Sequence, residues 1–136
     1  MKDYGITGKV LIDWPSAKGN ITIPSGVAAI GDSVFIWNTY LTGVTIPESV
    51  TYIGSGAFWA CFGIKNITIP ASVTKVGWGA FLLWTSSQTI NVRGHANQAS
   101  ADAAWRKEWR SPVELMTSDW DKCDAVIKYW NGSSYQ

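Results

Sequence analysis

Short stretches in which apolar and polar residues alternate recur along the chain at a fixed spacing. Residues 21–24, 44–47 and 67–70 each read as an apolar residue followed by Thr-Ile-Pro, and these stretches begin 23 residues apart. A related stretch at residues 90–92 begins 23 residues after the third. Alternation with a period of two predicts a short strand with one apolar face, and proline ends such a strand because it has no N–H to donate. The pattern therefore predicts three 23-residue repeats and a fourth strand over residues 21–92.

The rest of each repeat keeps the same register. Four further columns hold a valine, an isoleucine or valine, a glycine and a phenylalanine: Val27, Val50, Val73; Ile30, Ile53, Val76; Gly31, Gly54, Gly77; Phe35, Phe58, Phe81. We expect the phenylalanine to fill the interior of each layer, and the glycine to need either a positive φ or a close backbone approach. A unit this short cannot bury its own apolar face, so successive units must stack into a solenoid. The long connections return the chain to the same edge, which makes the stacked strands parallel.

The segments on either side of the repeats are predicted to close the stack, which makes residues 1–136 a single domain. Residues 1–20 form the N-terminal cap, with an irregular strand in the apolar run at residues 9–15. Residues 93–136 form the C-terminal cap, with a helix over residues 96–110, an insertion over residues 111–124 and a last strand over residues 125–130. The end units of a solenoid are atypical because they must cover its exposed layers. Five tryptophans fall in these caps: Trp14, Trp105, Trp109, Trp120 and Trp130.

Composition and charge narrow the class of protein. Hydrophobic residues make up 46% of the chain and charged residues 15%, with a formal net charge of +1. This balance argues against a disordered chain and against a nucleic-acid binder, which usually carries a basic face. No apolar run is long enough to predict membrane insertion, and the N-terminus has no apolar run of signal-peptide length. We therefore expect either an intracellular protein or a part of a larger exported one.

Candidate chemistry is sparse. Cys61 and Cys123 are expected to be free, buried thiols, with a single bridge between them as the alternative. His95 has no partner at a catalytic motif spacing and is expected to face solvent beside the helix. The acidic cluster at residues 119–124 lacks the turn glycine and the bidentate glutamate of a calcium loop. The sequence therefore predicts a non-enzymatic protein without metal or cofactor.

The repeat columns resemble a known family. The pattern Ile-Thr-Ile-Pro-x-x-Val-x-x-Ile-Gly-x-x-Ala-Phe-x-x-Cys-x-x-Leu is similar to the BspA-like type of leucine-rich repeat. It is read most cleanly at residues 44–64, through Gly54, Ala57, Phe58, Cys61 and Ile64. The resemblance covers residues 8–93 and implies an α/β repeat solenoid, a short right-handed leucine-rich-repeat stack of parallel strands with a C-terminal helix and strand cap. It also implies a bacterial cell-surface or secreted protein that binds host proteins or other cells.

Two columns depart from the family pattern in the third repeat. The cysteine column reads Asn38, Cys61, Trp84, and the leucine column reads Leu41, Ile64, Ser87. Either Trp84 fills the space that Ser87 leaves, or the third repeat is distorted. Apolar residues also replace the usual small or polar ones just after the phenylalanine, in the columns Ile36, Trp59, Leu82 and Trp37, Ala60, Leu83.

These two apolar columns predict a continuous strip along the solenoid, because neighbouring layers lie about 4.8 Å apart. With the aromatic residues that flank it, the strip gives a hypothetical partner-binding surface made of Ile36, Trp37, Trp59, Phe62, Trp78, Leu82, Leu83 and Trp84. Tryptophan is enriched in interaction hot spots. The alternative is that these side chains pack inward or beneath the C-terminal segment. The strand face carries a polar ladder instead, which is typical of a solvated surface: Thr22, Thr45, Thr68 and Asn91.

Three functional hypotheses follow from this strip. The first is a protein-binding module that uses the strip and the C-terminal insertion. The second is a structural homodimer in which the strip pairs two copies, and the third is a carbohydrate-binding module that stacks exposed tryptophans on sugars. The concentration of departures at one strip suggests a regular scaffold that was diversified for binding, by selection or by engineering.

Overall fold

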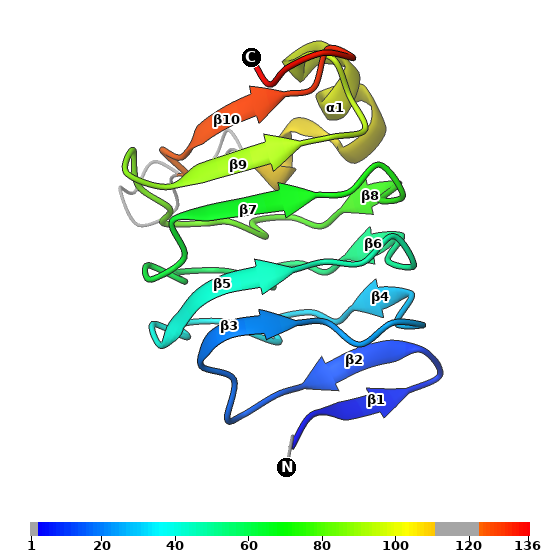
Figure 1. Ribbon diagram of the computed structural model, residues 1–136, viewed down its shortest axis with the longest axis vertical. Helices are drawn as coiled ribbons and strands as arrows, with labels where there is room; N and C mark the ends of the chain where they lie inside the picture. Colours follow the sequence, from blue (N-terminus) through cyan, green and yellow to red (C-terminus); the bar gives the residue numbers. More distant parts are fainter. Residues whose placement is uncertain (1–2, 111–122) are drawn as a thin grey trace.

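The computed structural model describes residues 3–110 and 123–136, which form a stack of layers with strands on two faces (Figure 1). The strands are β1 (Gly5–Thr7), β2 (Val10–Asp13), β3 (Gly19–Thr22), β4 (Ala29–Ile30), β5 (Leu41–Thr45), β6 (Tyr52–Ile53), β7 (Asn66–Ile69), β8 (Lys75–Val76), β9 (Thr89–Val92) and β10 (Val126–Tyr129). The helices are α1 (Gln98–Trp105) and the 3-10 helix η1 (Lys107–Trp109). The predicted solenoid of parallel strands is confirmed.

Each repeat contributes two strands, one to each face. The front face holds β3 and β5 in one parallel pair and β7, β9 and β10 in a second parallel sheet. The second face is one sheet in the order β1, β2, β4, β6, β8, in which Ile30 pairs with Ile53 and Ile53 with Val76. The strands of the second face within the repeats are only two residues long, so the alternation of apolar and polar residues predicted the front strands alone.

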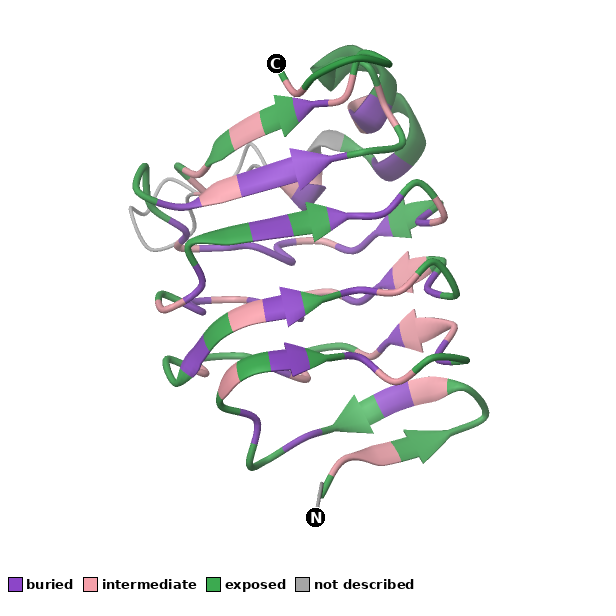
Figure 2. Cartoon of the chain, in the orientation of Figure 1, coloured by how far each residue is buried: buried purple, intermediate pink, exposed green. Residues whose placement is uncertain are grey.

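The apolar columns of the repeats form the core between the two faces, and Figure 2 shows buried residues on the strands of both faces. Phe35, Phe58 and Phe81 stack in consecutive layers, with ring centroids 5.4 and 5.6 Å apart and nearly parallel planes. Fully burying a phenylalanine contributes about 1.5–3 kcal/mol, and ring pairs of this kind add about 0.5–1.5 kcal/mol each. The predicted role of the phenylalanine column is confirmed.

The glycine column marks a close backbone approach and not a positive φ. A Cβ placed on Gly31 would lie 2.8 Å from the Leu11 carbonyl oxygen, and one on Gly77 would lie 2.5 Å from the Ser55 nitrogen. Positive φ values occur in two other columns, of which the first holds two glycines and the second none: Ser33, Gly56, Gly79 and Trp37, Ala60, Leu83. The layers therefore touch backbone to backbone at the glycine column, and the chain turns a few residues later.

The N-terminal cap is a β-hairpin, whereas the sequence predicted one irregular strand. β1 and β2 pair in antiparallel fashion, joined by Gly8 and Lys9, whose φ values of 56° and 66° are those of a tight hairpin turn. Trp14 is buried beneath this hairpin, with its ring 4.8 Å from that of Tyr4. The hairpin thus extends the second face by two strands, and Trp14 closes the end of the phenylalanine stack, 6.2 Å from Phe35.

The C-terminal cap begins with a helix shorter than predicted. The Asn97 side chain caps its start by accepting a hydrogen bond from the Ser100 nitrogen. The α-helix ends after Trp105, because Arg106 adopts a φ of 64°. Strand β10 lies within the predicted last strand at residues 125–130 and pairs in parallel with β9. The predicted insertion lies mostly outside the described residues, and with it Trp120, Asp119 and Asp121. No helix among the described residues is long and apolar enough to cross a membrane.

Candidate functional site

The candidate site lies on the segments that return the chain from the second face to the front face, at residues 32–40, 55–63 and 78–85. These segments form a third ladder of parallel hydrogen bonds. The Trp37 nitrogen donates to the Trp59 carbonyl oxygen at 2.7 Å, and the Ala60 nitrogen donates to the Leu82 carbonyl oxygen at 2.9 Å. Side chains at equal offsets in successive repeats are therefore neighbours, as the strip hypothesis required.

Aromatic side chains on the first two return segments are exposed. Trp37 is 53% exposed and Tyr40 is 78% exposed, while Ile36 and Phe62 are each 37% exposed. The rings of Trp37 and Phe62 meet edge to face, with centroids 6.1 Å apart. Sequence reasoning missed Tyr40 because its column continues as Gly63 and Ser86, which carry no apolar signal.

Two further tryptophans continue this surface toward the C-terminal cap. Trp59 and Trp78 are half-buried and pack edge to face, with centroids 6.2 Å apart. Leu83, also half-buried, follows on the third return segment. We call the set Ile36, Trp37, Tyr40, Trp59, Phe62 and Trp78 the aromatic surface.

Leu82 and Trp84 do not belong to this surface, which corrects the sequence-based hypothesis. Both are 1% exposed. The indole Nε1 of Trp84 donates to the Phe58 carbonyl oxygen at 2.8 Å, and the Cys61 thiol donates in the same way to the Phe35 carbonyl oxygen at 3.0 Å. Trp84 thus replaces cysteine as the donor that joins one layer to the preceding one, and it packs against the last ring of the phenylalanine stack.

Gln88 explains how the third repeat tolerates serine in the leucine column. Ser87 is exposed, whereas the Gln88 side chain is buried. Its Nε2 donates to the carbonyl oxygens of Cys61 and Ile64 at 2.9 and 2.8 Å, and its Oε1 accepts a hydrogen bond from the Thr85 nitrogen. Each polar atom of this buried side chain is therefore paired, and Trp84 and Gln88 together take the interior position that Ser87 leaves.

Cationic side chains lie beyond both ends of the aromatic surface. Trp78 lines a depression of about 450 Å³ together with Lys75, Arg106 and Glu108. Tyr40 lines another of about 290 Å³ together with Lys18 and residues 15–17. The centre of the surface is apolar and its margins are polar, which is the arrangement of a protein interface.

The thiols and the histidine show no sign of reactive chemistry. Cys61 and Cys123 are both free, Cys61 buried and Cys123 half-buried. Burial raises the pKa of Cys61 to about 12 and that of Cys123 to about 11, which keeps both thiols protonated and poorly nucleophilic at neutral pH. His95 is half-buried, not solvent-facing as expected, because its ring packs edge to face on Trp105, 4.8 Å away. Its Nδ1 lies 2.7 Å from the Ser100 hydroxyl, and burial lowers its pKa.

The C-terminal cap holds a polar cluster that fixes the helix. Asp102 accepts hydrogen bonds from the Trp109 indole at 3.0 Å and from Arg110 Nε at 2.9 Å, and it forms an ion pair with Arg110. The hydrogen bond to Asp102 raises the pKa of Arg110. Within residues 3–110 and 123–136, no group of three His, Cys, Asp or Glu residues is arranged to hold a metal ion.

Comparison with known proteins agrees with this architecture. A crystal structure of a leucine rich cell surface protein from Faecalibacterium prausnitzii A2-165 is similar, with a TM-score of 0.56 and 29% sequence identity. The similarity covers 68% of this chain and 31% of that chain, so the relative is much longer. No curated protein matches this chain significantly. Residues 16–105 match a family model described as BspA type leucine rich repeat region (6 copies), and the chain therefore belongs to the BspA-type leucine-rich-repeat family.

Proposed function

We propose that this chain is a non-enzymatic binding module that recognises a protein partner through the aromatic surface. The observation that carries the proposal is the exposure of Trp37 and Phe62, in contact on two neighbouring return segments, together with the exposed Tyr40 three residues after Trp37. Large rings left in water cost free energy unless a partner covers them. Aromatic side chains are also the commonest anchors of protein interfaces, since they bury much area with few rotatable bonds.

The backbone supports a binding role for the Trp37 side chain in particular. Trp37, Ala60 and Leu83 share a positive φ of 58° to 66°, so this conformation belongs to the repeat and favours glycine or asparagine at each position. A tryptophan gains nothing from this conformation, and it leaves half of its surface exposed. A tryptophan at position 37 therefore supports a binding role for this side chain.

A location at the cell surface is part of the same proposal. It rests on the similarity to a bacterial leucine rich cell surface protein and on the membership in the BspA-type family. Partners outside the cell are accordingly the first to test.

The experiment measures binding of the immobilised chain to a panel of purified extracellular-matrix and serum proteins by a surface biosensor. For a partner that binds, we expect Trp37→Gly to weaken affinity at least tenfold, or about 1.4 kcal/mol. Glycine suits the positive φ at this position, so the fold is retained. Thr22→Val, a change to an exposed residue on β3, is the matched control and should bind like the wild type.

Two results would contradict the proposal. One is a partner that binds Trp37→Gly and Phe62→Ser as tightly as the wild type, because the contact would then lie elsewhere. The other is a stable dimer in light scattering that dissociates on Trp37→Gly, because the aromatic surface would then serve self-association.

A further inference from the structure

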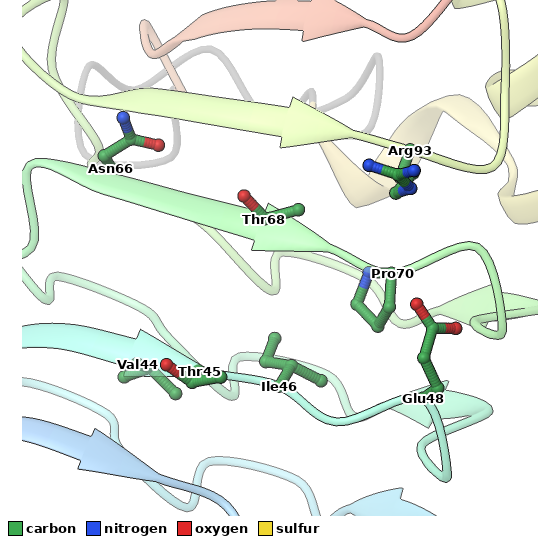
Figure 3. A pocket seen from close by; sticks show the side chains of 8 residues that line it. All are labelled: Val44, Thr45, Ile46, Glu48, Asn66, Thr68, Pro70 and Arg93. Carbon is green, nitrogen blue, oxygen red and sulfur yellow. The ribbon is translucent and has the colours of Figure 1, made fainter. Parts of the chain in front are cut away.

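The front face of the solenoid is interrupted between β5 and β7. No ladder joins these two strands, although β3 pairs with β5 and β7 pairs with β9. The same two repeats remain joined on the second face, where β6 pairs with β8. They also remain joined along the return segments, where the Phe58 nitrogen donates to the Ala80 carbonyl oxygen. The gap is thus confined to the strand face, and Figure 3 shows the side chains of β5 and β7 on its two sides.

The interruption leaves peptide groups of both strands facing each other without hydrogen bonds. The Thr45 carbonyl oxygen accepts from the Ile23 nitrogen, so the alternation of a parallel ladder turns the peptide groups of Val44 and Ile46 toward β7. In the same way, the Ile69 carbonyl oxygen accepts a hydrogen bond from the Arg93 nitrogen. The peptide groups of Asn66 and Thr68 therefore point toward β5. Among the described residues, neither a strand ladder nor a backbone hydrogen bond outside the ladders joins these two edges. Thr45 and Thr68 beside the gap are exposed, so these unpaired N–H and C=O groups are accessible to a polar ligand.

The gap opens into a cavity of about 300 Å³, which is the lower end of the range for small-ligand sites. Its lining includes the hydroxyls of Thr45 and Thr68 and the amide of Asn66, whose Oδ1 accepts a hydrogen bond from Asn91 Nδ2. Glu48 and Arg93 flank Pro70 at one end (Figure 3). Arg93 also lies over the Trp130 ring, 4.9 Å from its centroid.

We infer that this groove binds a neutral saccharide. Each sugar hydroxyl both donates and accepts a hydrogen bond, and the groove offers N–H and C=O groups in alternation, together with hydroxyl and amide side chains. One carboxylate and one guanidinium leave the site without a net charge, so neither an anion nor a cation is favoured. The groove is separate from the aromatic surface. Saccharide binding in the groove does not depend on the function proposed for that surface.

A peptide strand fits this groove less well than a sugar. Inserting a strand between β5 and β7 requires two ladder steps, about 9.6 Å, whereas Cα atoms of the two strands come within 8 Å of each other. The second face holds the same repeats at ladder spacing, which prevents them from moving apart. The hydroxyl groups along one edge of a sugar are narrow enough to enter the groove. The rings of the sugar would then lie over the front face.

The test is a titration of the ¹⁵N-labelled chain with maltotriose, cellotriose and chitotriose at millimolar concentrations, followed by amide NMR shifts. We expect at least one trisaccharide to shift the amides of Val44, Ile46, Asn66 and Thr68 in a saturable manner. For that sugar, Thr45→Val and Glu48→Gln should each weaken affinity about tenfold. Thr22→Val is the matched control, since Thr22 occupies the same column on β3 outside the groove, and it should leave affinity unchanged. Trp37→Gly should also bind the sugar normally.

Three outcomes would overturn the inference. The first is the absence of shifts at these amides with all three sugars. The second is a set of shifts confined to the indole of Trp59 and its neighbours, which would place sugar binding on the aromatic surface. The third is a capped tetrapeptide of threonine and valine that shifts the groove amides when the sugars do not, which would make the groove a peptide site.

Discussion

Replacing Gly54 by alanine tests whether backbone contact between layers holds the solenoid together. The added Cβ would lie 2.6 Å from both the nitrogen and the Oδ1 of Asp32 and 2.6 Å from the carbonyl carbon of Gly31. Each distance is about 1 Å below the optimum for non-bonded atoms. Two of these atoms belong to the backbone of the preceding layer, which the pairing of β4 with β6 holds in place. Overpacking of this kind costs about 1–3 kcal/mol, occasionally more, and we expect the upper end of that range.

The matched control is Gly56→Ala, two residues further on. Gly56 has a φ of 63°, but a Cβ there would meet its nearest atoms only at 3.4 Å. An alanine in the left-handed conformation destabilises the folded state by about 1–2 kcal/mol. Alanine also lowers the conformational entropy of the unfolded chain, which offsets about 0.4–1 kcal/mol of this loss. In thermal and urea unfolding followed by circular dichroism, Gly54→Ala should lower Tm by about 6–9 °C. Gly56→Ala should lower it by less than half as much. A Gly56 variant as destabilised as the Gly54 variant would refute the assignment of close contact to the glycine column.

Three further substitutions probe the core and the C-terminal cap. Trp84→Phe should lower the free energy of unfolding by about 0.5–1.5 kcal/mol in urea titrations, because the Phe58 carbonyl oxygen loses the indole hydrogen bond and keeps only the one from the Cys61 nitrogen. Burial raises the pKa of the Cys61 thiol from 9.0 to about 12, so its contribution to stability is complete below pH 9 and declines as pH rises toward 12. The decline should approach about 1.4 kcal/mol per pH unit, and Cys61→Ala should reduce the slope of stability against pH in that window. Asp102→Ala should cost about 1–3 kcal/mol, since the buried Trp109 indole loses its acceptor and Arg110 its ion pair, and hydrogen exchange should show faster opening of α1.

The sequence predicted those parts of the fold in which side chains repeat at a fixed offset. The front strands and the phenylalanine stack follow from repeated columns, such as the one that contains Phe58. An apolar residue that recurs at the same position of every repeat is buried between the layers of the solenoid. The two-residue strands of the second face are too short for any periodicity to reveal. The positive φ at Trp37 and Leu83 escaped notice because neither residue is a glycine, which is the usual signal for that conformation.

The candidate site was predicted in part, for a related reason. A column shows which residues are neighbours, but it does not show whether their side chains point into the core. Ile36 and Leu82 share one column offset, yet the first is 37% exposed and the second 1%. The sequence did not predict the interruption of the front face. Residues 44–47 and 67–70 have nearly the same sequence, although the strands that contain them do not pair.

The buried side-chain donors of the repeats imply a direction of folding. Asn38 donates to the Ala17 carbonyl oxygen, Cys61 to that of Phe35 and Trp84 to that of Phe58, so each donor reaches back to a layer that precedes it in the chain. During synthesis the N-terminal part emerges first, and the acceptor of each bond is thus available before its donor leaves the ribosome. Each new layer can therefore form its side-chain hydrogen bond to the preceding layer as soon as it leaves the ribosome. This order begins at the N-terminal hairpin and does not require the C-terminal helix.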